Sequence, residues 1–93
     1  MMTGPVTERE ARIVNPLGLH ARPAAQLVRL ASTFAADIFY SKDGVEVNGK
    51  SIMGVMMLAA ECGSSIIIRA AGADADRAVE ALAELVANGF GEM

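Results

Sequence analysis

One histidine, His20, provides the clearest candidate for chemistry in this chain of 93 residues. Histidine is the only side chain whose ordinary pKa, about 6.5, lies near neutrality, so a neutral ring nitrogen can act as a nucleophile at physiological pH. Arg22 follows two residues later, and a guanidinium can form paired hydrogen bonds with phosphate oxygens. The two residues predict a phosphate-bearing site. A plainer interpretation stays open, in which His20 caps or packs at a turn and Arg22 is a solvated charge.

The residues around His20 predict that it stands at the start of a helix. Pro16 and Gly18 interrupt the preceding strand pattern, so the chain can turn sharply before His20. Pro23 falls in the first helical turn, where its missing N–H removes no hydrogen bond. The unpaired N–H groups and the dipole at such a position favour an exposed anion by about 0.3–1 kcal/mol. A phosphate on His20 would therefore be stabilised.

Hydrophobic periodicity predicts the elements that position this site, in the order β-α-β-β-α-β-α. Apolar residues recur every three or four positions after Ala21 and again after Asp74, which is typical of amphipathic helices. A third, short and buried helix is expected after Ser51, and Asp43-Gly44 predicts a two-residue hairpin. We expect strands over residues 8–14, 37–42, 45–50 and 64–70, and helices over 21–34, 52–60 and 74–88. The fold class is α+β, an open-faced sandwich in which three helices cover one face of a four-stranded, mostly antiparallel sheet.

Length, composition and charge narrow the function classes. The chain suits a single domain over residues 1–93, with a core of aliphatic side chains because only 4% of residues are aromatic. A net charge of −3 argues against nucleic acid as a partner. We find no leader and no apolar run that could cross a bilayer, so we expect no membrane insertion. The single cysteine, Cys62, indicates a reducing, cytoplasmic location and, with one histidine, no metal site.

Two segments carry a resemblance to a known family. Gly18-Leu19-His20-Ala21-Arg22-Pro23-Ala24 closely resembles the active-site signature of the HPr family, the histidine-containing phosphocarriers of the bacterial phosphoenolpyruvate-dependent phosphotransferase system. The segment from Asn48 to Met56 resembles the regulatory-serine motif of that family. The predicted element order is also that of the HPr-like open-faced sandwich. Leu17 departs from the pattern, because the family often has a polar residue there that could help to hold the phosphate.

The resemblance implies a phosphoryl relay between proteins. His20 would accept a phosphoryl group at Nδ1 from phosphorylated enzyme I and donate it to an enzyme IIA domain, with Arg22 supporting the phosphorylated state. The protein would be a monomeric, stoichiometric carrier and not an enzyme, and would need no cofactor or metal. Ser51 would be the target of an HPr kinase/phosphorylase. The resemblance and the apolar run together assign partner docking to Leu19, Ala21, Ile52 and Met53, with Lys50 and Arg29 as rim charges.

Several alternatives stay open at the level of sequence. Ser51 can be a helix N-cap and nothing more, since serine is favoured there in any protein. Leu19, Ile52, Met53 and Met56 can be core residues, although a helix that is apolar on every side must expose some of them. As a whole, the protein could be a regulatory module that acts through phosphorylation-dependent binding, for instance in a nitrogen-linked branch. An unrelated ligand-binding sandwich is a third reading, which the paired motifs disfavour.

Overall fold

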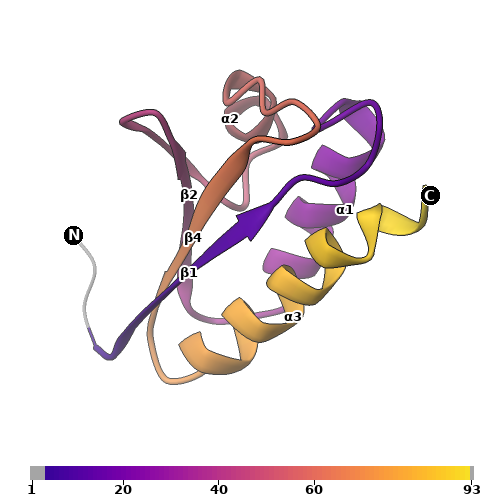
Figure 1. The fold of residues 1–93 in the computed structure, drawn as a ribbon. Helices are drawn as coiled ribbons and strands as arrows, with labels where there is room; N and C mark the ends of the chain where they lie inside the picture. Colours follow the sequence, from indigo (N-terminus) through magenta and orange to yellow (C-terminus); the bar gives the residue numbers. More distant parts are fainter. Residues whose placement is uncertain (1–3, 93) are drawn as a thin grey trace.

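The computed structural model describes residues 4–92 and shows a sheet with helices on one side (Figure 1). The elements follow in the predicted order, β-α-β-β-α-β-α, with one short 3₁₀ helix at the end. Their bounds are β1 Val6–Arg12, α1 Ala21–Ala31, β2 Asp37–Lys42, β3 Val45–Asn48, α2 Ile52–Met57, β4 Ser65–Ala71, α3 Ala75–Ala87 and η1 Gly89–Gly91. The predicted fold class is confirmed.

The four strands form one sheet in the order β1-β4-β2-β3. Every pairing is antiparallel, so the sheet is fully rather than mostly antiparallel. The β-branched run of β4 lies between two neighbours, as expected for an inner strand. Asp43 and Gly44 turn the β2–β3 hairpin with positive φ angles of 52° and 82°, which is the backbone that a two-residue hairpin turn requires.

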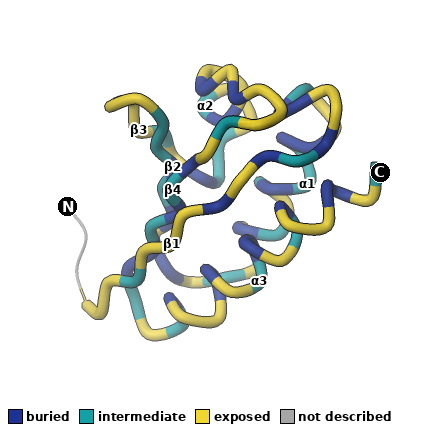
Figure 2. The backbone as a smooth tube through the Cα atoms, viewed as in Figure 1, coloured by how far each residue is buried: buried dark blue, intermediate teal, exposed yellow. Residues whose placement is uncertain are grey.

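The core lies between the sheet and the helices α1 and α3, which run side by side across one face (Figure 1). Alternate residues of the two inner strands are buried, as in Ile38 and Tyr40 of β2 and Ile66 and Ile68 of β4. The helices contribute their apolar sides, and buried positions recur on one side of each (Figure 2). The open face of the sheet is charged, with Arg69 of β4 between glutamates of β1 and β3.

Four expectations about element bounds need correction. β3 ends at Asn48, whereas the predicted strand ran to residue 50. β1 begins at Val6 and ends at Arg12, whereas the predicted strand ran to residue 14. α1 ends at Ala31, three residues before the predicted end. α2 ends at Met57 and is mostly exposed, because a six-residue helix at the end of the sheet buries only Val55.

Candidate functional site

The loop between β1 and α1 carries His20 and depends on a close backbone approach at Gly18. Gly18 has a φ of +66°, and a Cβ atom there would lie 2.5 Å from the carbonyl oxygen of Ala60. Beside this contact, the Leu19 N–H donates to the same oxygen at 2.9 Å. Only glycine fits this backbone and this spacing, so the segment after α2 holds the loop in place.

His20 occupies the N-cap position of α1. Its backbone is extended, with φ −76° and ψ −174°, and its side chain makes no capping hydrogen bond. Its carbonyl accepts the first helical hydrogen bond, from the Ala24 N–H at 3.0 Å. Pro23 has no N–H to satisfy, and a side-chain cap is absent, so the first N–H groups of the helix, at Ala21 and Arg22, have no intrahelical acceptor. His20 is therefore the N-cap residue by position, but its side chain does not cap the helix.

The imidazole of His20 contacts a carboxylate at the far end of the chain. Nε2 lies 2.9 Å from Oε2 and 3.1 Å from Oε1 of Glu92. The His20 side chain is 36% exposed and that of Glu92 17%. The hydrogen bond from His20 lowers the pKa of Glu92, and the amide of Asn15 and the charge of Arg22 act in the same direction. Since an ionised carboxylate can only accept, Nε2 carries the proton and the neutral ring keeps its lone pair on Nδ1.

Arg22 lies on the exposed first turn of α1. Its guanidinium takes part in no hydrogen bond or ion pair among residues 4–92. Its positive charge is one of the effects that lower the pKa of the Glu92 carboxylate. The predicted pair of imidazole and guanidinium therefore shares one corner of the molecule, with the guanidinium free to reach a ligand. Its role toward phosphate stays a prediction.

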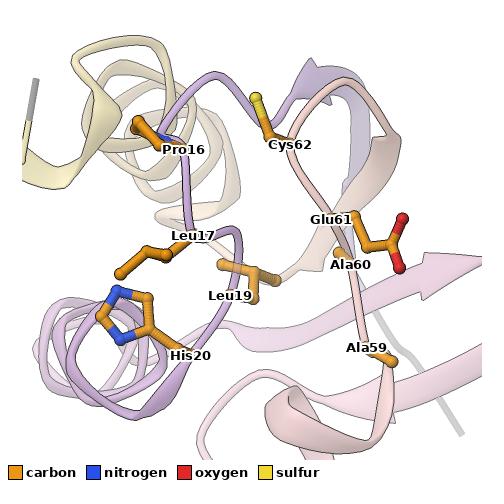
Figure 3. A pocket seen from close by; sticks show the side chains of 8 residues that line it. All are labelled: Pro16, Leu17, Leu19, His20, Ala59, Ala60, Glu61 and Cys62. Atoms are coloured by element: carbon orange, nitrogen blue, oxygen red, sulfur yellow. The ribbon is translucent and has the colours of Figure 1, made fainter.

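A shallow hollow lies beside the imidazole, between the His20 loop and the segment that follows α2 (Figure 3). Leu17 projects next to the His20 ring and is 75% exposed. Cys62 on the opposite wall is an exposed free thiol whose Sγ lies 3.7 Å from the Val14 carbonyl oxygen. Leu17 thus makes the wall beside the imidazole apolar, at the position where the family that the sequence resembles often has a polar residue. The lining residues are Pro16, Leu17, Leu19, His20, Ala59, Ala60, Glu61 and Cys62.

Ser51 is the N-cap of α2. Its hydroxyl oxygen accepts a hydrogen bond from the Gly54 N–H at 3.1 Å, and its backbone is extended, with φ −119° and ψ 117°. The predicted capping role is confirmed. Its role as a kinase target stays a prediction, and its half-buried side chain is open enough to solvent to leave that role available.

The predicted docking residues divide by exposure. Ile52 and Met53 are exposed, Met53 by 74%, and Ala21 is exposed next to His20. Leu19 is a correction, because its side chain is only 5% exposed and packs in the core. It lies where the loop crosses over the interior, so it anchors the loop and offers little surface to a partner.

The two predicted rim charges also differ. Lys50 is half-buried and its Nζ donates to the Phe34 carbonyl oxygen at 2.8 Å, so this ammonium already links two parts of the chain. Arg29 is exposed on the last turn of α1, away from the His20 end of the helix. The contact of either residue with a partner stays a prediction.

Two residues at the site carried no signal in the sequence. Asn15 is fully buried and its Nδ2 donates to Glu92 Oε1 at 2.9 Å and to the Gly18 carbonyl oxygen at 2.8 Å. Asn15 looked like one more turn residue, and Glu92 stands at the end of the chain without a motif. Their separation of 77 positions along the chain hides the contact from any local pattern.

Two further observations concern other classes of site. Among residues 4–92, no three side chains of His, Cys, Asp or Glu gather as metal ligands. No helix in that part of the chain is both long and apolar enough to cross a membrane.

Comparison with known proteins gives consistent matches over most of the chain. A family model described as the PTS HPr component phosphorylation site matches residues 7–88. The phosphocarrier protein HPr of Cupriavidus necator is 48% identical over 85 residues, which are 91% of this chain and 96% of that protein. The HPr-like protein Crh of Bacillus subtilis is 49% identical over 69 residues, 74% of this chain and 81% of Crh.

Solved structures agree with the sequence matches. The crystal structure of HPr-C-His from Thermoanaerobacter tengcongensis has a TM-score of 0.90 at 44% identity, covering 94% of this chain and 98% of that one. The HPr dimer from the same organism has a TM-score of 0.75 at 46% identity, covering 87% and 93% of the two chains.

Proposed function

Because this chain belongs to the HPr family of phosphocarriers of the phosphotransferase system, we propose that His20 accepts a phosphoryl group at Nδ1 from phosphorylated enzyme I. It then passes the group to enzyme IIA domains. The observation that carries the proposal is the engagement of Nε2 by Glu92, which leaves Nδ1 as the basic nitrogen of a partly exposed ring. Members of this family are carriers that are consumed and regenerated in each transfer, not enzymes.

The surroundings of Nδ1 supply positive electrostatics for a bound phosphoryl group. The free N–H groups at the start of α1 favour an anion, and Arg22 can swing toward it because nothing in residues 4–92 holds its guanidinium. Phosphoryl transfer needs positioning and charge stabilisation more than covalent chemistry from the protein. The relay therefore requires no metal or cofactor on this chain.

Partner docking would use the apolar surface next to His20. We define this docking surface as Leu17, Ile52, Met53 and Met56, all of which are exposed large hydrophobic side chains. Methionine side chains adapt to differently shaped partners, which suits a carrier that must meet a donor and several acceptors in turn. Ala21 extends the surface toward the imidazole.

We further propose that the whole chain acts as one monomeric domain in the cytoplasm, without nucleic acid. The net charge of −3 and the exposed free thiol of Cys62 fit that setting. A T. tengcongensis HPr has been seen as a dimer, so light scattering coupled to size exclusion should give the mass of one chain, 9.7 kDa.

Labelling with radioactive phosphoenolpyruvate and enzyme I tests the carrier function directly. The wild-type protein should gain acid-labile label that chases onto an enzyme IIA domain, and His20→Ala should gain none. Arg22→Ala should still fold, with the label slower to appear and faster to hydrolyse. A wild-type protein that takes no label would overturn the proposal and leave the regulatory binding module as the better reading.

Regulation at Ser51 is the second part of the proposal. A phosphate there would add about −1.5 to −2 charges at the end of α2 that faces partners, and would repel them by charge and hydration. Ser51→Asp should slow transfer from enzyme I far more than it changes thermal stability. The matched variant Ser51→Ala should lose about 1 kcal/mol of stability with the cap, yet keep its transfer rate. Equal transfer by Ser51→Asp and the wild type would contradict this part.

A further inference from the structure

The end of the chain is fixed against the His20 loop by an apolar anchor. Phe90 is buried in the core cluster, with a positive φ of 59°. Its carbonyl oxygen accepts a hydrogen bond from Gln26 Nε2 of α1 at 3.3 Å. Glu92 follows two residues later, and its carboxylate Oε2 lies 2.9 Å from Nε2 of the imidazole.

The side-chain amide of Asn15 holds the Glu92 carboxylate by a hydrogen bond. Its Nδ2 donates both to Glu92 Oε1 and to the Gly18 carbonyl oxygen, at 2.9 and 2.8 Å. Because both partners are acceptors, the amide can take only one orientation. Its Oδ1 is buried with no hydrogen-bond partner among residues 4–92. The Asn15 amide therefore leaves one acceptor without a hydrogen bond while its Nδ2 donates to Glu92 and to the loop.

From this geometry we infer that Glu92 is a positioning residue for His20, held in place by Asn15 and acting on the proton of Nε2. The inference rests on the proposed phosphoryl transfer to Nδ1 and names two residues that the family motif does not contain. Glu92 keeps the proton on Nε2, so that the lone pair of the neutral ring stays on Nδ1. It also fixes the plane of the ring, since both carboxylate oxygens lie within 3.1 Å of Nε2.

The same contact stabilises the charge that develops during transfer. The Nδ1 lone pair forms a bond to phosphorus while the bond between phosphorus and the donor breaks, and its electron pair stays with the donor. The proton on Nε2 is retained, so the ring gains a formal positive charge. That charge faces the ionised Glu92, and a preorganised carboxylate stabilises it without having to reorganise. Transfer of the phosphoryl group from His20 to an acceptor follows the same steps in the opposite order.

Two variants of Glu92 separate the two effects. Glu92→Gln keeps an oxygen that can accept from Nε2 but removes the negative charge, whereas Glu92→Ala removes both. Glu80→Gln, on the exposed outer side of α3, is the matched control for loss of one carboxylate. With enzyme I as donor, we expect kcat to fall about tenfold in Glu92→Gln and further in Glu92→Ala, with KM within about twofold. Glu80→Gln should match the wild type.

A spectroscopic measurement tests the inference without any phosphoryl transfer. In protein labelled with ¹⁵N at His20, the ring nitrogens of the neutral wild type should report almost entirely the Nε2–H tautomer. Glu92→Ala should relax toward the mixture of a free histidine side chain, and Glu92→Gln should lie between the two. Asn15→Ala, checked for folding by thermal unfolding, should shift the spectrum in the same direction as Glu92→Ala.

The outcomes distinguish this inference from the proposed function. Wild-type ¹⁵N signals in Glu92→Ala, or an unchanged kcat in both Glu92 variants, would overturn the inference while His20 still carries label. A wild-type protein that takes no label would overturn the proposed function, and the ¹⁵N spectra would still decide whether Glu92 sets the tautomer. A raised KM with an unchanged kcat would mean that Glu92 acts in docking, and this result would also overturn the inference.

Discussion

At the scale of single residues, Gly18 determines where the imidazole of His20 lies. It combines a positive φ with a close backbone approach, because a Cβ atom there would lie 2.5 Å from the Ala60 carbonyl oxygen. Both demands exclude a side chain, because a Cβ atom would be strained by the backbone and blocked by that oxygen. A change at Gly18 must therefore move the loop away from the segment after α2, and His20 moves with it.

Gly18→Ala should lower the free energy of unfolding by about 2 kcal/mol or more, the sum of a left-handed backbone cost and an overpacking cost. Gly63→Ala is the matched control, because Gly63 also has a positive φ, +91°, but a Cβ atom there meets nothing within 4 Å. Urea unfolding of both variants measures the difference. Equal losses would show that the contact with Ala60 costs little and that only the backbone angle matters.

Short motifs revealed some residues of the site and could not reveal others. The places of His20 and Arg22 at the start of α1, and of Ser51 at the start of α2, were predictable because each residue belongs to a short segment with a local physical meaning. Asn15 and Glu92 were not, since their contact exists only after β1, the core and α3 have come together. Leu19 was misassigned for a related reason, because an apolar residue beside a histidine does not show which side of the loop it will face.

At the scale of elements, periodicity predicted α1 and α3, which span enough residues for a clear pattern. The Asp43-Gly44 pair predicted the hairpin, and a run of β-branched residues predicted the inner strand β4. α2 was harder, because a run that is apolar on every side has no periodicity from which to read its end. Its early end at Met57 follows from its place at the end of the sheet, where there is little surface to cover. Burial on α2 is decided by neighbours rather than by its own sequence.

Asp74 connects two elements that the sequence keeps apart. It is the N-cap residue of α3, and its carboxylate accepts hydrogen bonds from the N–H groups of Ala35 and Ala36, each at 2.8 Å, just before β2 begins. The Ala35 hydrogen bond is the largest of the effects that lower the pKa of Asp74. Folding therefore favours the ionised carboxylate, and the connection between α1 and β2 depends on it.

The stability that Asp74 contributes should depend on pH. A carboxylate whose pKa is lowered by folding stabilises fully above its ordinary value of 3.8, and the contribution is lost as the pH falls through the lowered value. Asp74→Asn should unfold more easily than the wild type at pH 7, and the difference should shrink below pH 3.8. Denaturant unfolding across this range measures it, with Asp37→Asn as control. A difference that does not change with pH would mean that the charge of Asp74 is irrelevant.

At the scale of the whole molecule, two surfaces differ in polarity: the open face of the sheet is charged, and the docking surface is apolar. The open face of the sheet carries the charged network of Glu8, Arg69 and Glu46. The docking surface at the other end gathers exposed Leu17 and the apolar residues of α2 around the His20 corner. A charged sheet face resists nonspecific association, whereas an apolar rim around a reactive group favours brief, repeated contacts with partners.

Met53 offers the sharpest test of that division, because its side chain is 74% exposed and packs little within the protein. Met53→Asp should leave thermal unfolding unchanged but raise KM for transfer from enzyme I roughly tenfold or more, since a carboxylate in an apolar contact must lose its hydration. Val45→Asp on β3 removes another exposed apolar residue, 50% exposed and remote from His20. It should transfer normally, because the effect depends on place and not on loss of surface hydrophobicity. If both variants weakened transfer equally, α2 would lose its distinction as the docking element. If neither did, partners would have to approach His20 from the side of Ala21 and Arg22 instead.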